Sequence, residues 1–195
     1  GKVKEAFELM DRYELYDISA GYHKYDGAFC TYLDTYGVPF IFMNPWQTNM
    51  DKLSFAHEFG HFVNDFVCEG SYAGMDVAEV QSQAMEYMAL SSTDEPALEK
   101  YKLADSLDIY VLQRAYALFE LEAYELQDDD LTADNLIVLF DRICKEFGIT
   151  GLSETDFVSI GHFYTDPMYV ISYVVSNDLA MQIYELEKAT AGAGM

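Results

Sequence analysis

The stretch LSFAHEFGHFVNDF, from Leu53 to Phe66, holds His57, Glu58 and His61 in the pattern H-E-x-x-H. Its apolar residues recur at spacings of three and four, which predicts an amphipathic α-helix. In a helix the two histidines stand one turn apart on the same face, so their imidazoles can bind one metal ion. Glu58 then projects beside that ion, where a general base for a metal-activated water is needed. The alternative is two surface histidines beside an ordinary glutamate.

A second helix is expected to supply the third metal ligand, because catalytic zinc sites usually combine three protein ligands with one water. The segment VAEVQSQAMEYMAL, residues 77–90, carries Glu79 and Glu86 two turns apart on one face. Either glutamate can bind the metal, and the other can hydrogen-bond a ligand. Asp65 lies one turn beyond His61 and can orient that imidazole, although a solvent-facing aspartate fits the pattern equally well.

The rest of the chain is predicted to be mainly α, with one small antiparallel β element. Aromatic and β-branched runs at 28–33 and 38–43 flank the turn DTYG and predict a hairpin. Apolar periodicity predicts further helices, at about residues 2–17, 97–126, 132–147 and 167–188. No internal repeat or low-complexity linker divides the sequence, so a single domain over residues 1–195 is expected.

The composition is that of a globular acidic protein. With 51% hydrophobic residues, the 195-residue chain has enough apolar material for a packed core. Thirty-four acidic residues against eleven basic ones give a net charge of -23, which repels nucleic acids and anionic lipid surfaces. We therefore expect neither nucleic acid nor membrane as a partner. Most of the acid is expected on solvated helix faces, and attraction of cationic peptides is the alternative.

The cysteines and the lack of long apolar runs indicate a cytoplasmic protein. Cys30, Cys68 and Cys144 are odd in number and widely spaced, so neither a disulfide framework nor a cysteine zinc site is predicted. No secretory signal pattern and no run of about eighteen apolar residues occurs in the sequence. Free thiols in a reducing compartment fit these observations.

Three sequence blocks, in order, carry a resemblance to a known family. They are DGAFCTYLDTYGVPFIFMNPWQTNMDKLSFAHEFGHF at residues 26–62, AEVQSQAMEYM at 78–88, and GHFYTDPMYVISYVVS at 161–176. Together they resemble the catalytic portion of the oligoendopeptidase F and thimet oligopeptidase family of zinc peptidases. The resemblance extends over about residues 5–188. It implies a zincin-like metallopeptidase catalytic domain that binds one Zn²⁺ per chain and hydrolyses peptide bonds in oligopeptides.

The resemblance also implies roles for individual residues. The metal ligands would be His57, His61 and Glu79. Glu58 would be the general base, and Glu86 would hydrogen-bond a ligand. The groups that stabilise the oxyanion of the transition state would be His162, Tyr169 and Tyr173. A phenol or imidazole donor suits that task on chemical grounds.

Substrate binding is expected at the second strand of the hairpin, where Val38, Phe40 and Phe42 could pair with an extended peptide backbone. The chain also departs from the family. The interval from His61 to Glu79 is shorter than expected, which implies a trimmed loop at 67–75 and leaves Glu86 as a fallback ligand. The family's large N-terminal helical region is absent, so the chain is either a fragment or a minimal peptidase with an open cleft.

Two other functions remain open from the sequence. An aminopeptidase-like zinc site also has a helix-borne glutamate after its H-E-x-x-H, but NPWQTNMD at 44–51 offers no obvious motif for a free amine. The other is a metal-binding fragment without turnover. The sequence gives no indication of oligomeric state.

Overall fold

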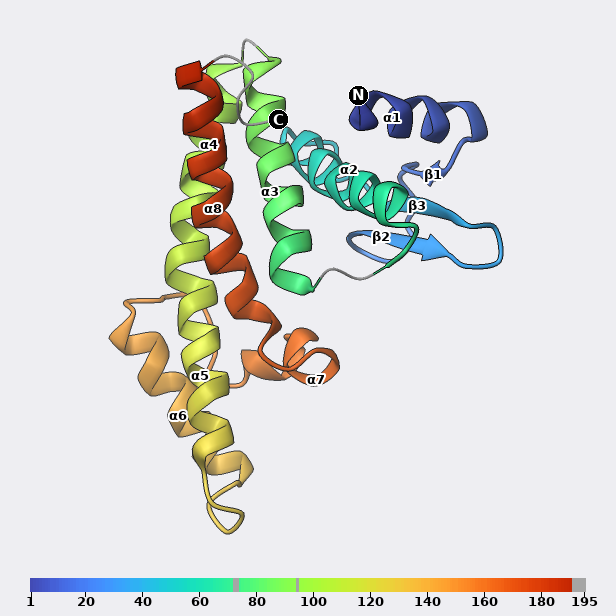
Figure 1. The fold of residues 1–195 in the computed structure, drawn as a ribbon. Helices are drawn as coiled ribbons and strands as arrows, with labels where there is room; N and C mark the ends of the chain where they lie inside the picture. The colour runs from blue at the N-terminus through green and yellow to red at the C-terminus, as the bar shows by residue number, and fades with distance from the viewer. Residues whose placement is uncertain (72–73, 94, 191–195) are drawn as a thin grey trace. The chain divides into compact units, whose positions relative to one another are not determined.

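A computed structural model describes residues 1–71, 74–93 and 95–190 (Figure 1). The helices are α1 (Lys2–Tyr13), α2 (Met50–Cys68), α3 (Met75–Ser91), α4 (Pro96–Asp108), α5 (Arg114–Glu125), α6 (Ala133–Glu146), α7 (His162–Thr165) and α8 (Tyr169–Thr190). The strands are β1 (Tyr16–Asp17), β2 (Ala28–Leu33) and β3 (Val38–Met43). The mainly α class is confirmed. None of the helices in these residues is both long and apolar enough to cross a lipid bilayer.

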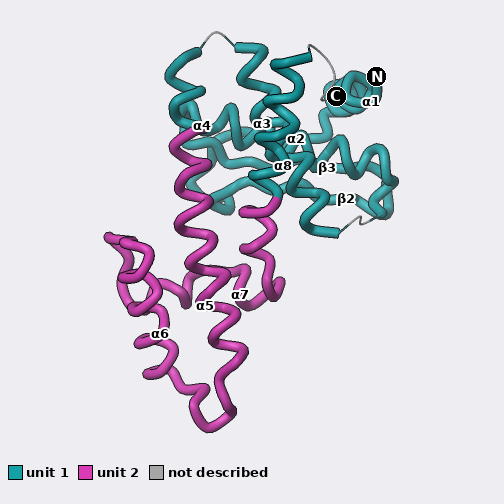
Figure 2. Tube along the Cα trace, turned by 60° about the vertical axis from the view of Figure 1, so that its left-hand side comes forward, with its two compact units in different colours: residues 1–102, 176–195 teal, residues 103–175 magenta. Residues whose placement is uncertain are grey.

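The chain forms two compact units (Figure 2). Unit 1 consists of residues 1–102 and 176–195, and unit 2 consists of residues 103–175. The boundaries fall inside α4 and α8. We describe each unit by itself, and the single domain expected over 1–195 stays a prediction.

The sheet of unit 1 has the strand order β1-β3-β2. β2 and β3 pair antiparallel from Ala28 opposite Met43 to Leu33 opposite Val38, which confirms the predicted hairpin. β1 adds a parallel pairing that the sequence did not reveal, because a two-residue strand has no measurable periodicity.

The first helix also ends earlier than predicted, at Tyr13 rather than at residue 17. Glu14 adopts a left-handed conformation with φ 49°, and its N–H bonds back to Asp11 and Met10. This conformation stops the helix and turns the chain into β1.

The role of Val38, Phe40 and Phe42 in substrate binding stays a prediction. β3 is the central strand, paired along its length with β2, whereas β1 covers its other side only at Ile41 and Phe42. Side chains alternate along a strand, so these three share the face opposite to Ile41, which packs against α2. Among the described residues, the outer edges of the sheet belong to β1 and β2, and β2 is the longer of these two strands.

Helix α2 lies between the sheet and α3 (Figure 1). On its sheet side, Phe59 and Phe62 pack with Ile41 and with residues of α1. A second buried cluster joins α2 to α3, α4 and the middle of α8, and its members are Leu53, Tyr87, Leu90, Leu98 and Ala180. Burial of each large apolar side chain contributes about 1.5–3 kcal/mol. The helix that carries the H-E-x-x-H pattern is therefore held on two sides.

Gly60, within the H-E-x-x-H segment, allows α2 and α3 to approach closely. A Cβ atom at this position would lie 2.5 Å from the Cα atom of Ser82 and 3.1 Å from the carbonyl oxygen of Gln81. These are backbone atoms, so relief would require the helices to separate.

Unit 2 is a helical unit around an aromatic core. Its buried residues are Ala115, Tyr116, Ala117, Phe119, Phe140, Ile143, Cys144, Phe157 and Val170. The long helix predicted for 97–126 is a continuous helical run with a π-helical turn at Ile109–Gln113 between α4 and α5. The helix predicted for 132–147 is confirmed as α6, and its N-cap Thr132 accepts a hydrogen bond from the Asn135 N–H.

Candidate metal centre

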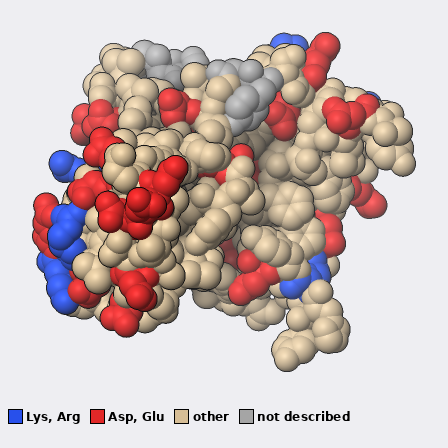
Figure 3. Space-filling view, turned by 90° about the horizontal axis from the view of Figure 1, so that it is seen from below, with Lys and Arg blue, Asp and Glu red and all other residues tan. Residues whose placement is uncertain are grey.

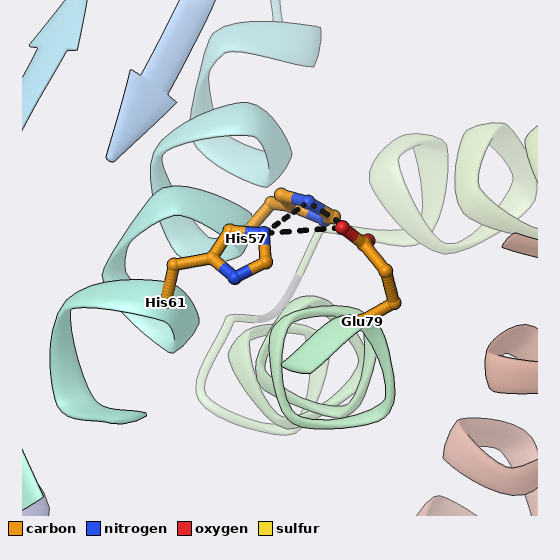
Figure 4. A group of neighbouring side chains, drawn as sticks. All are labelled: His57, His61 and Glu79. Carbon is orange, nitrogen blue, oxygen red and sulfur yellow. Dashed lines mark hydrogen bonds and ion pairs between the residues drawn. The ribbon is translucent and has the colours of Figure 1, made fainter. Parts of the chain in front are cut away.

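Two histidines of α2 and one glutamate of α3 point toward one another (Figure 4). The Nε2 atoms of His57 and His61 lie 3.2 Å apart. Glu79 places one carboxylate oxygen 3.4 Å from Nε2 of His57 and the other 3.4 Å from Nε2 of His61. Glu79 itself is buried, with 1% of its surface exposed. The three residues predicted as ligands thus come together, and they form the one group of this kind among the described residues.

The spacing of these atoms fits a zinc ion. Ligands held about 2.0–2.1 Å from a tetrahedral zinc lie about 3.3–3.4 Å from each other. The measured separations of 3.2 Å and 3.4 Å match this value closely. Two imidazoles and a carboxylate are also a common donor set for catalytic zinc.

Behind His57, a line of charged groups continues away from the cluster. Nδ1 of His57 lies 2.7 Å from one oxygen of Glu86, and the other oxygen of Glu86 lies 2.7 Å from Nζ of Lys102. An ionised carboxylate only accepts hydrogen bonds, so Nδ1 of His57 carries the proton. In the neutral ring, the lone pair of Nε2 then faces His61 and Glu79.

Lys102 was not identified from the sequence, since lysine in an amphipathic helix is usually a surface residue. It has 0% exposure. The sequence holds one signal, because Lys102 follows Leu98 by four residues and so shares its helix face, and the structure shows that both are buried. A lysine in line with the apolar face of a helix is a candidate buried cation.

Glu58 is buried, with 8% of its surface exposed, and lies between α2 and the sheet. Its carboxylate accepts a hydrogen bond from the backbone N–H of Cys30 on β2. The Ile41 N–H bonds to Leu15 on the β1 side, so the backbone groups of Cys30, opposite Ile41, point to the open edge of β2. Glu58 therefore stands at that edge.

The comparisons with known proteins agree with this geometry. Residues 4–194 match the model of peptidase family M3. The chain belongs to peptidase family M3. The structure is similar to PZ peptidase A solved with an inhibitor, with a TM-score of 0.83 and 23% identity over 99% of this chain and 38% of that one. A comparison with curated proteins finds no match.

Two further structures share the fold of this M3 chain. One is assigned as an oligoendopeptidase F, with a TM-score of 0.83 and 25% identity over 99% of this chain and 37% of that one. The other, from Bacillus anthracis and assigned likewise, has a TM-score of 0.74 and 21% identity over 97% of this chain and 34% of that one. The M3 chain spans little more than a third of each of these proteins.

The pKa values of Glu58 and Glu86, the two glutamates near His57, shift in opposite directions. Burial raises the pKa of Glu58, and the nearby His57 and His61 only partly oppose this effect. Burial also acts on Glu86, but the hydrogen bond from His57 and the charge of Lys102 outweigh it and lower the pKa of Glu86. Glu58 is thus suited to exchange a proton, whereas Glu86 is held as a carboxylate.

The pKa of His57 reflects the same balance. Burial disfavours the charged ring, but the hydrogen bond to Glu86 and the charges of Glu86, Glu79 and Glu58 outweigh burial. The net result raises the pKa of His57 to about 9. A cation is therefore strongly favoured among these carboxylates, whether it is a proton or a metal ion.

Asp65 interacts with His61 through charge and accepts a 3.5 Å hydrogen bond from the amide of Asn64. Burial raises the pKa of Asp65, and His61 opposes that change. Its side chain also lines a groove of about 410 Å³ with Tyr32 and Glu69. Its role in orienting His61 stays a prediction.

In unit 2, the residues predicted to support the transition state form a cluster of their own. The rings of His162 and Tyr169 stack at 4.5 Å, and those of Tyr169 and Tyr173 meet edge-on at 5.0 Å. The Tyr173 hydroxyl lies 3.5 Å from Nε2 of His162. The cluster brings two phenols and one imidazole together, and its catalytic role stays a prediction.

Proposed function

We propose that this M3 chain is the catalytic part of a zinc-dependent endopeptidase that hydrolyses peptide bonds in oligopeptides. The observation that carries the proposal is the group formed by His57, His61 and Glu79, whose ligand atoms are spaced by 3.2–3.4 Å. Membership of a peptidase family supports the reaction class.

The three residues would hold one Zn²⁺ per chain. When bound, the ion would act as a Lewis acid that polarises the peptide carbonyl and makes a water molecule easier to deprotonate. Glu86 would keep His57 in the tautomer that presents Nε2, through the 2.7 Å contact to Nδ1.

Glu58 would act as the general base and then as the general acid. It takes a proton from the attacking water and delivers it to the amine of the departing product. Its raised pKa, caused mainly by burial, brings it closer to neutral pH, where proton transfer in both directions is efficient.

An extended substrate would bind along an unpaired strand edge, which β2 offers along its length and β3 offers before Ile41, at Val38 and Phe40. Strand addition uses backbone groups that the sheet itself leaves unpaired. Cys30 presents its backbone to the edge of β2 and bonds to Glu58, so a peptide there would pass beside the proposed base.

The oxyanion donors would be His162, Tyr169 and Tyr173. Their mutual contacts within unit 2 and the resemblance of GHFYTDPMYVISYVVS to the corresponding family segment support this proposal. One donor of this kind is worth about 3 kcal/mol in other enzymes that stabilise an oxyanion.

Elemental analysis and peptide cleavage test the proposal together. We expect one equivalent of zinc and cleavage of internally quenched peptides with blocked N-termini, with loss of both after treatment with a chelator. Cleavage restricted to peptides with a free amine would indicate an aminopeptidase. Stoichiometric zinc without cleavage of any peptide would indicate a binding fragment without turnover.

A further inference from the structure

A buried lysine stands behind the candidate metal centre. Lys102 of α4 places Nζ 2.7 Å from Glu86 of α3 and 5.2 Å from the ring centroid of Tyr87, and it has 0% exposure. Glu86 in turn contacts Nδ1 of His57 on α2 at 2.7 Å. The contacts link three helices in the order α4, α3, α2.

A fully buried ammonium group is costly, because its desolvation costs several kcal/mol even when a partner is present. The neighbouring position on the same face of α4, Leu98, packs in an apolar cluster with Leu53 and Leu90. An apolar side chain at position 102 would suit these surroundings. The charge at this position therefore calls for an explanation beyond packing.

The geometry of Glu86 provides one. Each of its two carboxylate oxygens has its own donor, with Lys102 on one side and His57 on the other, both at 2.7 Å. Charge-assisted bonds on both oxygens fix the rotation of the carboxylate group. With one donor removed, the group can rotate about its remaining bond and no longer fixes the imidazole plane.

We propose that Lys102 is a positioning residue of the metal centre, which holds Glu86 so that this carboxylate fixes the His57 ring with Nε2 directed at the metal. This inference rests on the proposed function, and it adds Lys102 as a second residue, behind Glu86, to the line that supports His57. Outer residues that orient a ligand histidine typically change metal affinity by about 10–100-fold when replaced.

The test measures zinc affinity by chelator competition in four proteins: wild type, Lys102→Met, Glu86→Gln and the double variant. We expect Lys102→Met to weaken zinc binding by about tenfold or more. In the Glu86→Gln background, the same change should add little, because Lys102 acts through Glu86. Lys100→Met is the matched control on the exposed side of α4, and zinc affinity should not change there.

A purely structural lysine would give a different result. It would lower the melting temperature of the metal-free protein and leave unchanged both the zinc affinity and the tautomer of His57, which long-range ¹H–¹⁵N spectra report. Lys102→Gln, which keeps an N–H donor without the charge, serves as a second variant if Lys102→Met does not fold, and we expect weakened zinc binding in it too.

Zinc affinity within about twofold of wild type in both folded Lys102 variants would overturn the proposal, as would additive effects of Lys102→Met and Glu86→Gln. The proposed function fails separately. A wild-type protein that binds zinc but cleaves no peptide contradicts the peptidase activity, and the zinc measurements on Lys102 keep their meaning.

Discussion

At the scale of the residue, the environments of Glu58 and Glu86 explain why two carboxylates near His57 can serve different purposes. Burial raises the pKa of Glu58, whereas His57 and Lys102 together lower that of Glu86. The sequence alone cannot separate the two, because the difference comes from the hydrogen bond between His57 and Glu86 and from the charge of Lys102, which are contacts between separate helices. Divergent pKa values in neighbouring acids are the usual means of dividing proton transfer from structural support.

Gly60→Ala is expected to damage the metal centre without removing a ligand. The new Cβ would lie 2.5 Å from the Ser82 backbone and push α2 away from α3, which separates His57 and His61 from Glu79. Overpacking of this kind costs about 1–3 kcal/mol of stability. Chemical denaturation and zinc titration should both show a loss. Gly161→Ala, where no atom lies within 4 Å of the added Cβ, is the control, and equal zinc affinity in both variants would contradict the argument.

The Cys30 thiol should make the folded protein less stable at alkaline pH. Burial, reinforced by the charges of Asp65 and Glu58, raises the pKa of its thiol far above the ordinary value. As pH rises above about 8.5, the unfolded thiol ionises while the folded one keeps its proton, so the free energy of unfolding falls by up to about 1.4 kcal/mol per pH unit. Denaturant titrations between pH 8 and 10 should show that the free energy of unfolding falls less per pH unit in Cys30→Ala than in the wild type. An equal fall in both proteins would contradict this prediction.

At the scale of the element, the start of α8 depends on a strained turn. Met168 has φ 60°, which is unfavourable for a residue with a side chain, and its N–H donates to the buried Glu120 at 2.6 Å. The next residue is Tyr169, whose ring stacks on His162. A carboxylate on α5 thus anchors the turn that positions the histidine and tyrosine cluster.

Glu120→Ala should release this turn. Loss of a hydrogen bond to a buried charged acceptor costs about 1.5–3 kcal/mol, so the melting temperature should fall. We also expect faster hydrogen exchange at Met168 and Tyr169, whereas Glu122→Ala on the same helix, at a less buried position, should leave that exchange rate unchanged. Unaltered exchange at Met168 in Glu120→Ala would show that the turn does not depend on this contact.

Tyr169→Phe tests the proposed oxyanion donors. The change removes one hydroxyl and keeps the ring that stacks on His162. We expect kcat to fall by about 10²-fold, because one such donor contributes about 3 kcal/mol, with zinc affinity unchanged. Tyr164→Phe is the matched control, since Tyr164 is 62% exposed. Full activity of Tyr169→Phe would remove this residue from the mechanism.

Periodicity and motif spacing predict the local elements well and the contacts between them poorly. The helix with His57 and His61 and the hairpin follow from spacing. Spacing leaves Glu79 and Glu86 as alternatives for the third ligand, and the family resemblance favours Glu79, which the structure places beside the two histidines. Spacing does not show that β3 is central, because strand order depends on β1, which is too short to have a pattern. Lys102 was missed for a related reason, since its burial arises from packing between separate helices.

At the scale of the whole molecule, the net charge and the family membership describe the chain as a whole. Acidic side chains are spread over the face in Figure 3, and basic ones are few there, as the net charge of -23 predicts. The chain matches peptidase family M3 over residues 4–194 and spans little more than a third of the similar solved proteins. The group of His57, His61 and Glu79, which could hold a metal ion, lies entirely within unit 1.

The central claim is that Glu58 transfers protons at a zinc site formed by His57, His61 and Glu79. The most direct measurement compares wild type with Glu58→Gln for zinc content and for kcat on a quenched oligopeptide. We predict one equivalent of zinc in both proteins and a loss of at least about 10²-fold in kcat for the variant, because general acid–base catalysis contributes about 10²–10⁴-fold. Wild-type activity in a zinc-loaded Glu58→Gln variant would contradict the mechanism.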